Sequence, residues 1–91
     1  MKRRIIMKTF TYTIKDELGI HARPAGMLAK TAKALDSEIT IECGEKSAAA
    51  TKLMALMGMG IKCGDTITVT INGGDETASE KTMQEFFKAN L

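Results

Sequence analysis

The order of apolar and polar residues predicts four β-strands. Residues 8–14 (KTFTYTI) and 63–71 (CGDTITVTI) alternate between the two kinds and are rich in Thr, β-branched and aromatic side chains, as expected of strands with one buried face. Residues 38–43 (EITIEC) follow the same alternation. Residues 46–51 (KSAAAT) have lower β propensity, but the turn at Gly44-Glu45 positions them to pair with 38–43 as a hairpin.

Helical periodicity marks most of the remaining chain. From Ala22 to the residue before Asp36, apolar side chains recur every three or four positions, which predicts an amphipathic helix. Residues 51–60 (TKLMALMGMG) predict a short second helix with Thr51 as its N-cap. Residues 72–76 (NGGDE) predict a turn into a last helix. Its core-facing side chains are expected to be Ala78, Met83, Phe86 and Phe87.

The predicted order of elements is β-α-β-β-α-β-α. A four-stranded antiparallel sheet with three helices on one face buries every apolar stripe, so we expect an α+β open-faced sandwich. The length of 91 residues allows one domain. Because such a fold hosts many activities, function has to be inferred from individual residues.

The net charge of +2 does not describe the domain itself. Three of the 13 basic residues lie in the first four positions, which leaves ten basic against 11 acidic residues from Met7 onward. No basic patch is interleaved with aromatic residues, so we expect no nucleic acid among the partners.

We interpret residues 1–6 (MKRRII) as an N-terminal extension or an alternative start before a domain that spans residues 7–91. No apolar run is long enough for a signal peptide or a membrane span. We therefore expect a cytoplasmic monomer without membrane insertion.

The two cysteines lack the spacing of a metal site. Cys43 and Cys63 are twenty positions apart, with no CxxC pair and no histidine nearby, so free thiols in a reducing compartment are expected. We expect neither a metal nor another cofactor. A small metal-binding module that uses these cysteines and the methionines is an alternative, which metal analysis of the purified protein would test.

The segment GIHARPAG, residues 19–26, contains the single histidine and the single proline of the chain. Pro24 suits the first turn of a helix, where its missing amide hydrogen costs no hydrogen bond. His21 then lies at the helix N-terminus, with the backbone amides of Ala22 and Arg23 pointing outward. These amides, the helix dipole and the Arg23 guanidinium together favour an anion such as phosphate.

Imidazole can attack a phosphoryl group and form a reactive phosphoramidate. The positive surroundings favour the neutral, nucleophilic ring of His21. A lone histidine is ordinarily only a polar cap. The Gly-x-His-x-Arg-Pro spacing directly after a strand favours a reactive side chain instead. We therefore predict that His21 accepts a phosphoryl group and that Arg23 stabilises it.

The segment LGIHARPAG closely resembles the active-site segment of the HPr family, the histidine phosphocarriers of the bacterial sugar phosphotransferase system. The resemblance continues without gaps from Met7 through SEITIECGEKSA, LMALMGMGIKCGDTITV and the GGDE turn. It implies that His21 is phosphorylated on Nδ1 by phospho-enzyme I, with phosphoenolpyruvate as ultimate donor. It also implies that IIA domains of sugar permeases receive the group, so that the protein is a carrier rather than a stand-alone catalyst. A carrier in a regulatory or nitrogen-linked phosphotransfer chain would share these residues and is the alternative.

The short helix is apolar on nearly all sides, and it is too short to bury every one of its side chains. Leu53 and Leu56 are candidates for the core, while exposed methionines suit a surface that binds several partners in turn. The resemblance implies docking through this helix and the preceding one. The residues predicted to dock are Met27, Lys30, Lys52, Leu53, Met54 and Met57.

Two positions depart from the family pattern. Leu18 stands where relatives often have a small polar residue, which removes a possible hydrogen bond to the histidine ring. Lys52 matches the position of a regulatory serine that many Gram-positive relatives carry at the start of the second helix. We therefore expect no regulatory serine here.

Overall fold

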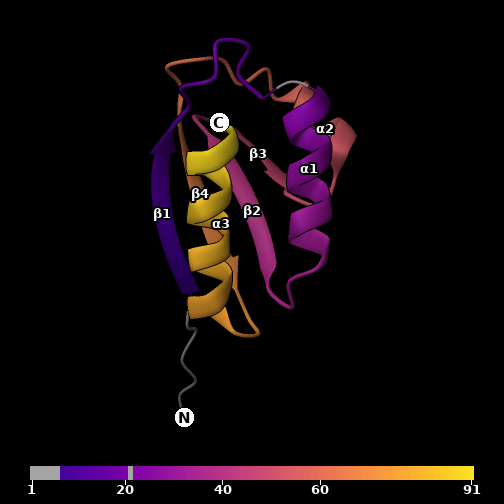
Figure 1. The fold of residues 1–91 in the computed structure, drawn as a ribbon, viewed down its shortest axis with the longest axis vertical. Coiled ribbons are helices and arrows are strands. Elements are labelled where there is room, and N and C mark those ends of the chain that lie inside the picture. Colours follow the sequence, from indigo (N-terminus) through magenta and orange to yellow (C-terminus); the bar gives the residue numbers. More distant parts are fainter. Residues whose placement is uncertain (1–6, 21) are drawn as a thin grey trace.

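The computed structural model describes residues 7–20 and 22–91 (Figure 1). Its elements follow the predicted order β-α-β-β-α-β-α. They are β1 (Met7–Thr13), α1 (Ala22–Lys33), β2 (Glu38–Cys43), β3 (Lys46–Ala49), α2 (Leu53–Gly58), β4 (Thr66–Asn72) and α3 (Glu76–Asn90).

The four strands form one antiparallel sheet in the order β1-β4-β2-β3. The last strand in the sequence, β4, therefore lies between the first two, and Val69 pairs with Phe10 on one side and Ile41 on the other. Figure 1 shows α1 and α3 in front of this sheet, running in opposite directions. The start of α1 and the end of α3 consequently lie at the same end of the molecule. The predicted α+β open-faced sandwich is confirmed.

The core lies between the sheet and the helices. Alternate residues of β2 and β4 point into it, because the side chains of a strand alternate between two faces. Phe87 of α3 is fully buried, and its ring lies 6.2 Å from that of Phe10, 5.4 Å from that of Tyr12 and 5.8 Å from that of Phe86. The other large, fully buried side chains are Ile14, Leu28, Ile41, Leu56, Ile67, Val69, Ile71 and Met83.

The first turn of α3 differs from the prediction. Met83, Phe86 and Phe87 are buried as expected, but Ala78 is exposed and its neighbour Ser79 is buried instead. The Ser79 hydroxyl lies 2.8 Å from that of Ser37 and can share a hydrogen bond with it. The inward position of this turn is therefore occupied by a hydrogen-bonded polar side chain.

The start of α2 also differs. The N-cap is Lys52 rather than Thr51, and its side chain makes no capping hydrogen bond. The amide of Lys52 donates to the Ala49 carbonyl (3.0 Å), and its carbonyl accepts from the amide of Leu56 (3.0 Å). The turn that leaves β3 thus shifts the helix start by one residue. Of the two leucines predicted as core candidates, Leu56 is fully buried and Leu53 is exposed.

Candidate functional site

Hydrogen bonds fix the conformation of the loop between β1 and α1. Asp16 shapes its tip, because its Oδ1 accepts from the amide of Leu18 (2.8 Å) and its carbonyl accepts from the amide of Gly19 (2.9 Å). The carbonyl oxygen of Leu91, after α3, accepts from the amides of Lys15 (2.6 Å) and Asp16 (2.9 Å). The residues that lead to the predicted phosphoacceptor are therefore held by the other end of the chain.

The predicted phosphoacceptor, His21, lies outside the described residues. Ala22, which follows it, is the first residue of α1, and both Ala22 and Arg23 are exposed while Pro24 is buried. The first amides of a helix have no acceptor within it, and the first turn of α1 carries no acidic side chain that could neutralise them. The described start of α1 thus combines two exposed residues with a first turn that holds no carboxylate.

A hollow of about 290 Å³ lies beside Arg23, between α1 and the end of α3. The contribution of α3 has no signal in the sequence, because no pattern links the two ends of the chain. Asn90 is held there by a hydrogen bond from its Nδ2 to the carbonyl of Phe86 (3.0 Å). The lining residues are Asp16, Arg23, Pro24, Met27, Ala89 and Asn90.

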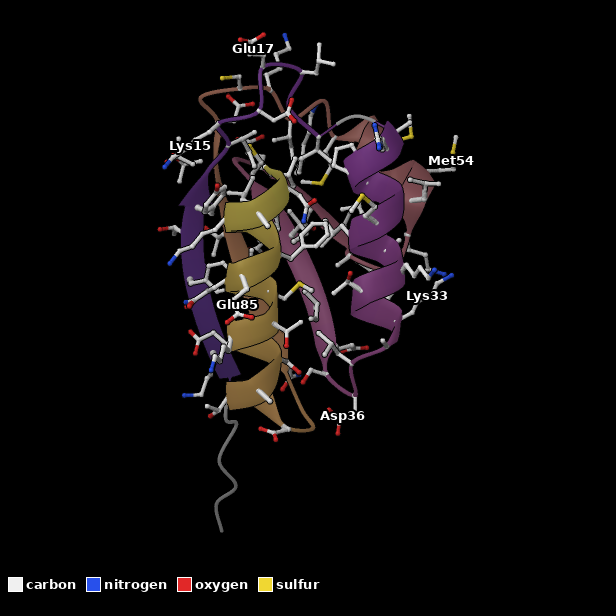
Figure 2. The ribbon with its side chains drawn as sticks, in the orientation of Figure 1. Lys15, Glu17, Lys33, Asp36, Met54 and Glu85 are labelled. Carbon is white, nitrogen blue, oxygen red and sulfur yellow. The ribbon has the colours of Figure 1, made fainter. Side chains whose placement is uncertain are left out.

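All six residues predicted to dock are exposed, although to different extents. Met54 is 77% exposed, whereas Leu53 and Met57 are 37% and 39% exposed. Figure 2 shows Met54 on α2 and Lys33 on α1 pointing outward on the same side of the molecule. Met59, which follows α2, is buried. The exposed side chains of α2 therefore form a surface, and the buried side chains of Leu56 and Met59 pack the helix against the core.

A groove of about 710 Å³ separates α1 from α2. It brings together four of the predicted docking residues and adds Lys33, which was missed although it follows Lys30 by one helical turn. Neither helix contains Asp or Glu, so the charged side chains of the groove are all lysines. The lining residues are Gly26, Ala29, Lys30, Lys33, Thr51, Lys52, Leu53, Met54 and Ala55.

The cysteines lie in different surroundings. Cys43 is half-buried in β2, and Cys63 is exposed and directs its thiol toward the carbonyl of Lys15 (3.7 Å); both are free. Within residues 7–20 and 22–91, no three His, Cys, Asp or Glu side chains are grouped to hold a metal ion. No helix in this part of the chain is both long and apolar enough to cross a membrane.

Comparison with known proteins identifies the family. Residues 8–89 match the family described as "PTS HPr component phosphorylation site". The phosphocarrier protein HPr of Mycoplasma capricolum subsp. capricolum is 44% identical over 69 residues, which cover 76% of this chain and 78% of that protein. A multiphosphoryl transfer protein of Xanthomonas campestris pv. campestris is 34% identical over 79 residues, which cover 87% of this chain and only 9% of that much longer protein.

A solved structure of the histidine-containing phosphocarrier protein of a mycoplasma superimposes with a TM-score of 0.84 at 37% identity, covering 87% of this chain and 90% of that one. The match in sequence spans nearly all the described residues, and the match in structure includes the sheet and its helices. This chain therefore belongs to the HPr family of phosphocarrier proteins.

Proposed function

We propose that the chain accepts a phosphoryl group on Nδ1 of His21 from phospho-enzyme I and passes it to IIA domains of sugar permeases. The observation that carries this proposal is the His-Ala-Arg-Pro sequence in a member of the HPr family, with its Ala22 as the first residue of α1. The exposed Ala22 and Arg23 and the absence of acidic residues from the first turn of α1 support it.

The chemistry is a reversible displacement at phosphorus. The lone pair of Nδ1 attacks, a phosphorus–nitrogen bond forms, and the bond from phosphorus to the donor group of enzyme I breaks with its electron pair staying on the donor. The Arg23 guanidinium and the first amides of α1 offset the charge that develops on the phosphoryl oxygens. The same displacement in the opposite direction delivers the group to a IIA domain.

The groove between α1 and α2 is proposed as the docking surface for these partners. Its lysines favour acidic partner surfaces, and flexible Met side chains can adapt to partners of different shape. Lys30, Lys52, Leu53 and Met54 line the groove, whereas Met27 lines the hollow beside Arg23. Because Lys52 has no hydroxyl, the position that matches the regulatory serine cannot carry a phosphate.

Incubation with enzyme I and phosphoenolpyruvate, followed by intact-mass analysis, tests the proposal. We expect the mass to rise by one phosphoryl group, and the adduct to be lost in acid and retained in base, as a phosphoramidate is. The matched variant His21→Ala should gain nothing. A phosphoryl group on His21→Ala, or none on the parent protein, would refute the assignment of His21.

A further inference from the structure

Residues 60–65, between α2 and β4, form a turn against which the loop that precedes His21 rests. We infer that this 60–65 turn is a positioning element for phosphotransfer, with Gly19 and Asp65 as positioning residues. The inference rests on the proposed function of His21 and adds to it the part of the fold that sets where the phosphoacceptor lies relative to the docking surface.

Hydrogen bonds join the loop to the turn at both of its ends. The amide of Ile20 donates to the carbonyl of Ile61 (3.1 Å), one residue before His21. At the other end the amide of Ile14 donates to the carbonyl of Asp65 (2.9 Å), and the amide of Gly64 donates to the carbonyl of Ile14 (2.8 Å). Figure 1 shows the two segments side by side at the end of the molecule where α1 begins. The loop is thus bonded to the turn at both ends.

Gly19 lies directly on the backbone of the turn. Its φ of +69° is a conformation that favours glycine. A Cβ at this position would collide with the carbonyl oxygen of Ile61 and come within 2.7 Å of the Cα atom of Lys62. Both atoms belong to backbone and cannot rotate away. Any side chain here must therefore lift the loop and strain the Ile20–Ile61 hydrogen bond.

Asp65 stabilises the turn by hydrogen bonds, and the turn follows α2 in the chain. Asp65 Oδ2 accepts from the amide of Lys62 (2.9 Å), and the Asp65 amide donates to the carbonyl of Lys62 (3.0 Å). Gly60, with a φ of +67°, ends the helix and donates to the carbonyl of Met57 (3.3 Å). One continuous segment therefore carries the exposed side chains of α2 and then the carbonyl of Ile61.

This continuity has a consequence for transfer. A partner that docks on α2 is placed relative to Ile61, and Ile61 in turn holds Ile20. Transfer between two bound groups depends steeply on their alignment, and a misplacement of about 1 Å can lower the rate roughly a hundredfold. Loosening the loop from the 60–65 turn should therefore slow transfer without weakening docking.

The variant Gly19→Ala tests this, with Gly44→Ala as its matched control. Gly44 has a similar φ of +62° but nothing within 4 Å of the position of a Cβ, so the control carries the conformational cost without the collision. We expect Gly19→Ala to lower the kcat of enzyme I-dependent phosphorylation at least tenfold and to change KM less than about twofold. Gly44→Ala should transfer like the parent protein. Equal kcat values for the two variants would overturn the inference.

The imidazole NMR signals of His21 provide a readout that needs no partner. They should shift in folded Gly19→Ala and stay in place in Gly44→Ala, while the methyl signals of Met54 and Met57 stay in place in both. Unshifted imidazole signals in Gly19→Ala would refute the positioning role even if the parent protein were never phosphorylated. A parent protein that gains no phosphoryl group on His21 refutes the proposed function instead.

Asp65 allows a second test if Gly19→Ala does not fold. Asp65→Ala removes the acceptor for the Lys62 amide, whereas Asp65→Asn retains an oxygen there. We expect Asp65→Ala to lower kcat severalfold and Asp65→Asn to restore most of it, with KM unchanged in both. Parent-like kcat in Asp65→Ala, or equal losses in the two variants, would contradict the role assigned to this side chain.

Discussion

The helices α1 and α3 begin in opposite ways. At the start of α3, Asp75 Oδ1 accepts from the amide of Ala78 (3.1 Å), and Oε2 of the buried Glu76 accepts from the amide of Gly73. The first turn of α1 contains no acidic residue, and its Ala22 and Arg23 are exposed. The protein thus supplies its own anions at one helix start and none in the first turn of the other.

This difference separates a structural helix start from one available to a ligand. A carboxylate near a helix N-terminus stabilises it by about 0.3–1 kcal/mol, and a capping side chain by about 1 kcal/mol. The first turn of α1 has no carboxylate of its own, and we propose that its positive end acts on a bound phosphoryl group instead. At α3 the carboxylate of Asp75 already accepts from the amide of Ala78, and the turn at Gly73-Gly74 joins β4 to the helix.

The largest effect is expected from Arg23→Ala. Loss of a charged hydrogen bond to the phosphoryl group should cost roughly 1.5–3 kcal/mol, or about a tenfold to hundredfold decrease in transfer rate. The melting temperature should not change, because Arg23 is exposed. Quenched-flow assays measure the transfer rate, and thermal unfolding measures the melting temperature. Arg23→Lys, which keeps the charge but not the planar fork, should be intermediate; unchanged kinetics in Arg23→Ala would make Arg23 a mere surface residue.

Ala22→Glu would give α1 the kind of start that α3 has. The carboxylate should stabilise the helix by about 0.3–1 kcal/mol. It should also repel the incoming phosphoryl group by roughly 1 kcal/mol, because like charges about 4 Å apart repel weakly at a position exposed to water. Transfer should therefore fall about fivefold while the melting temperature rises slightly. Ala22→Gln is the neutral control, and equal transfer rates for the two variants would argue against an anion site at this helix start.

Asp75→Ala would open the start of α3. Loss of the cap should lower the free energy of unfolding by about 1 kcal/mol, within a range of about 0.5–2 kcal/mol. Chemical denaturation measures this change, and Asp75→Asn should restore most of it. Phosphotransfer should stay at the parent rate, because the other end of α3 is the one that faces Arg23. A loss of transfer in folded Asp75→Ala would contradict the separation between the two helix starts.

Lys52→Glu probes the docking groove rather than the site itself. One exposed charge pair contributes roughly 0.2–1 kcal/mol, so binding to enzyme I should weaken by up to about fivefold. Lys81→Glu, at an exposed position on α3, is the control and should bind like the parent protein. Titration calorimetry at low salt suits this small difference. Docking of Lys52→Glu at parental affinity would remove Lys52 from the proposed surface.

The smallest effect is expected from deletion of residues 1–6. We propose that the domain begins at Met7, so the melting temperature and the transfer rate should both be unchanged. A lower melting temperature would show that Ile5 and Ile6 contribute to the fold.

Local sequence was enough to predict the elements and to single out the motif. Alternation in KTFTYTI and TITVTI determines which side chains share a face of a strand, and Pro24 determines where α1 can begin, because both depend only on backbone geometry within a few residues. His21 and Arg23 stand out for the same reason, since their relationship is two positions along the chain. These features could be recognised from sequence in any fold that contained them.

Which apolar residues are buried could not be inferred in the same way. Leu53 and Leu56 look alike in sequence, and only the packing of α2 buries one and exposes the other. Ser79 is buried and Ala78 exposed because Ser37, from a distant turn, offers the hydroxyl a partner. The capping position of α2 likewise depends on how the chain leaves β3.

The arrangement around the site was decided by tertiary structure alone. Placing β4 between β1 and β2 brings the 60–65 turn against the loop before His21, and running α3 antiparallel to α1 brings Asn90 beside Arg23. The contact that requires glycine at position 19 is made with Ile61 and Lys62, far away in the chain. Local patterns encode backbone angles and buried faces, whereas contacts between distant segments follow from packing all the faces at once.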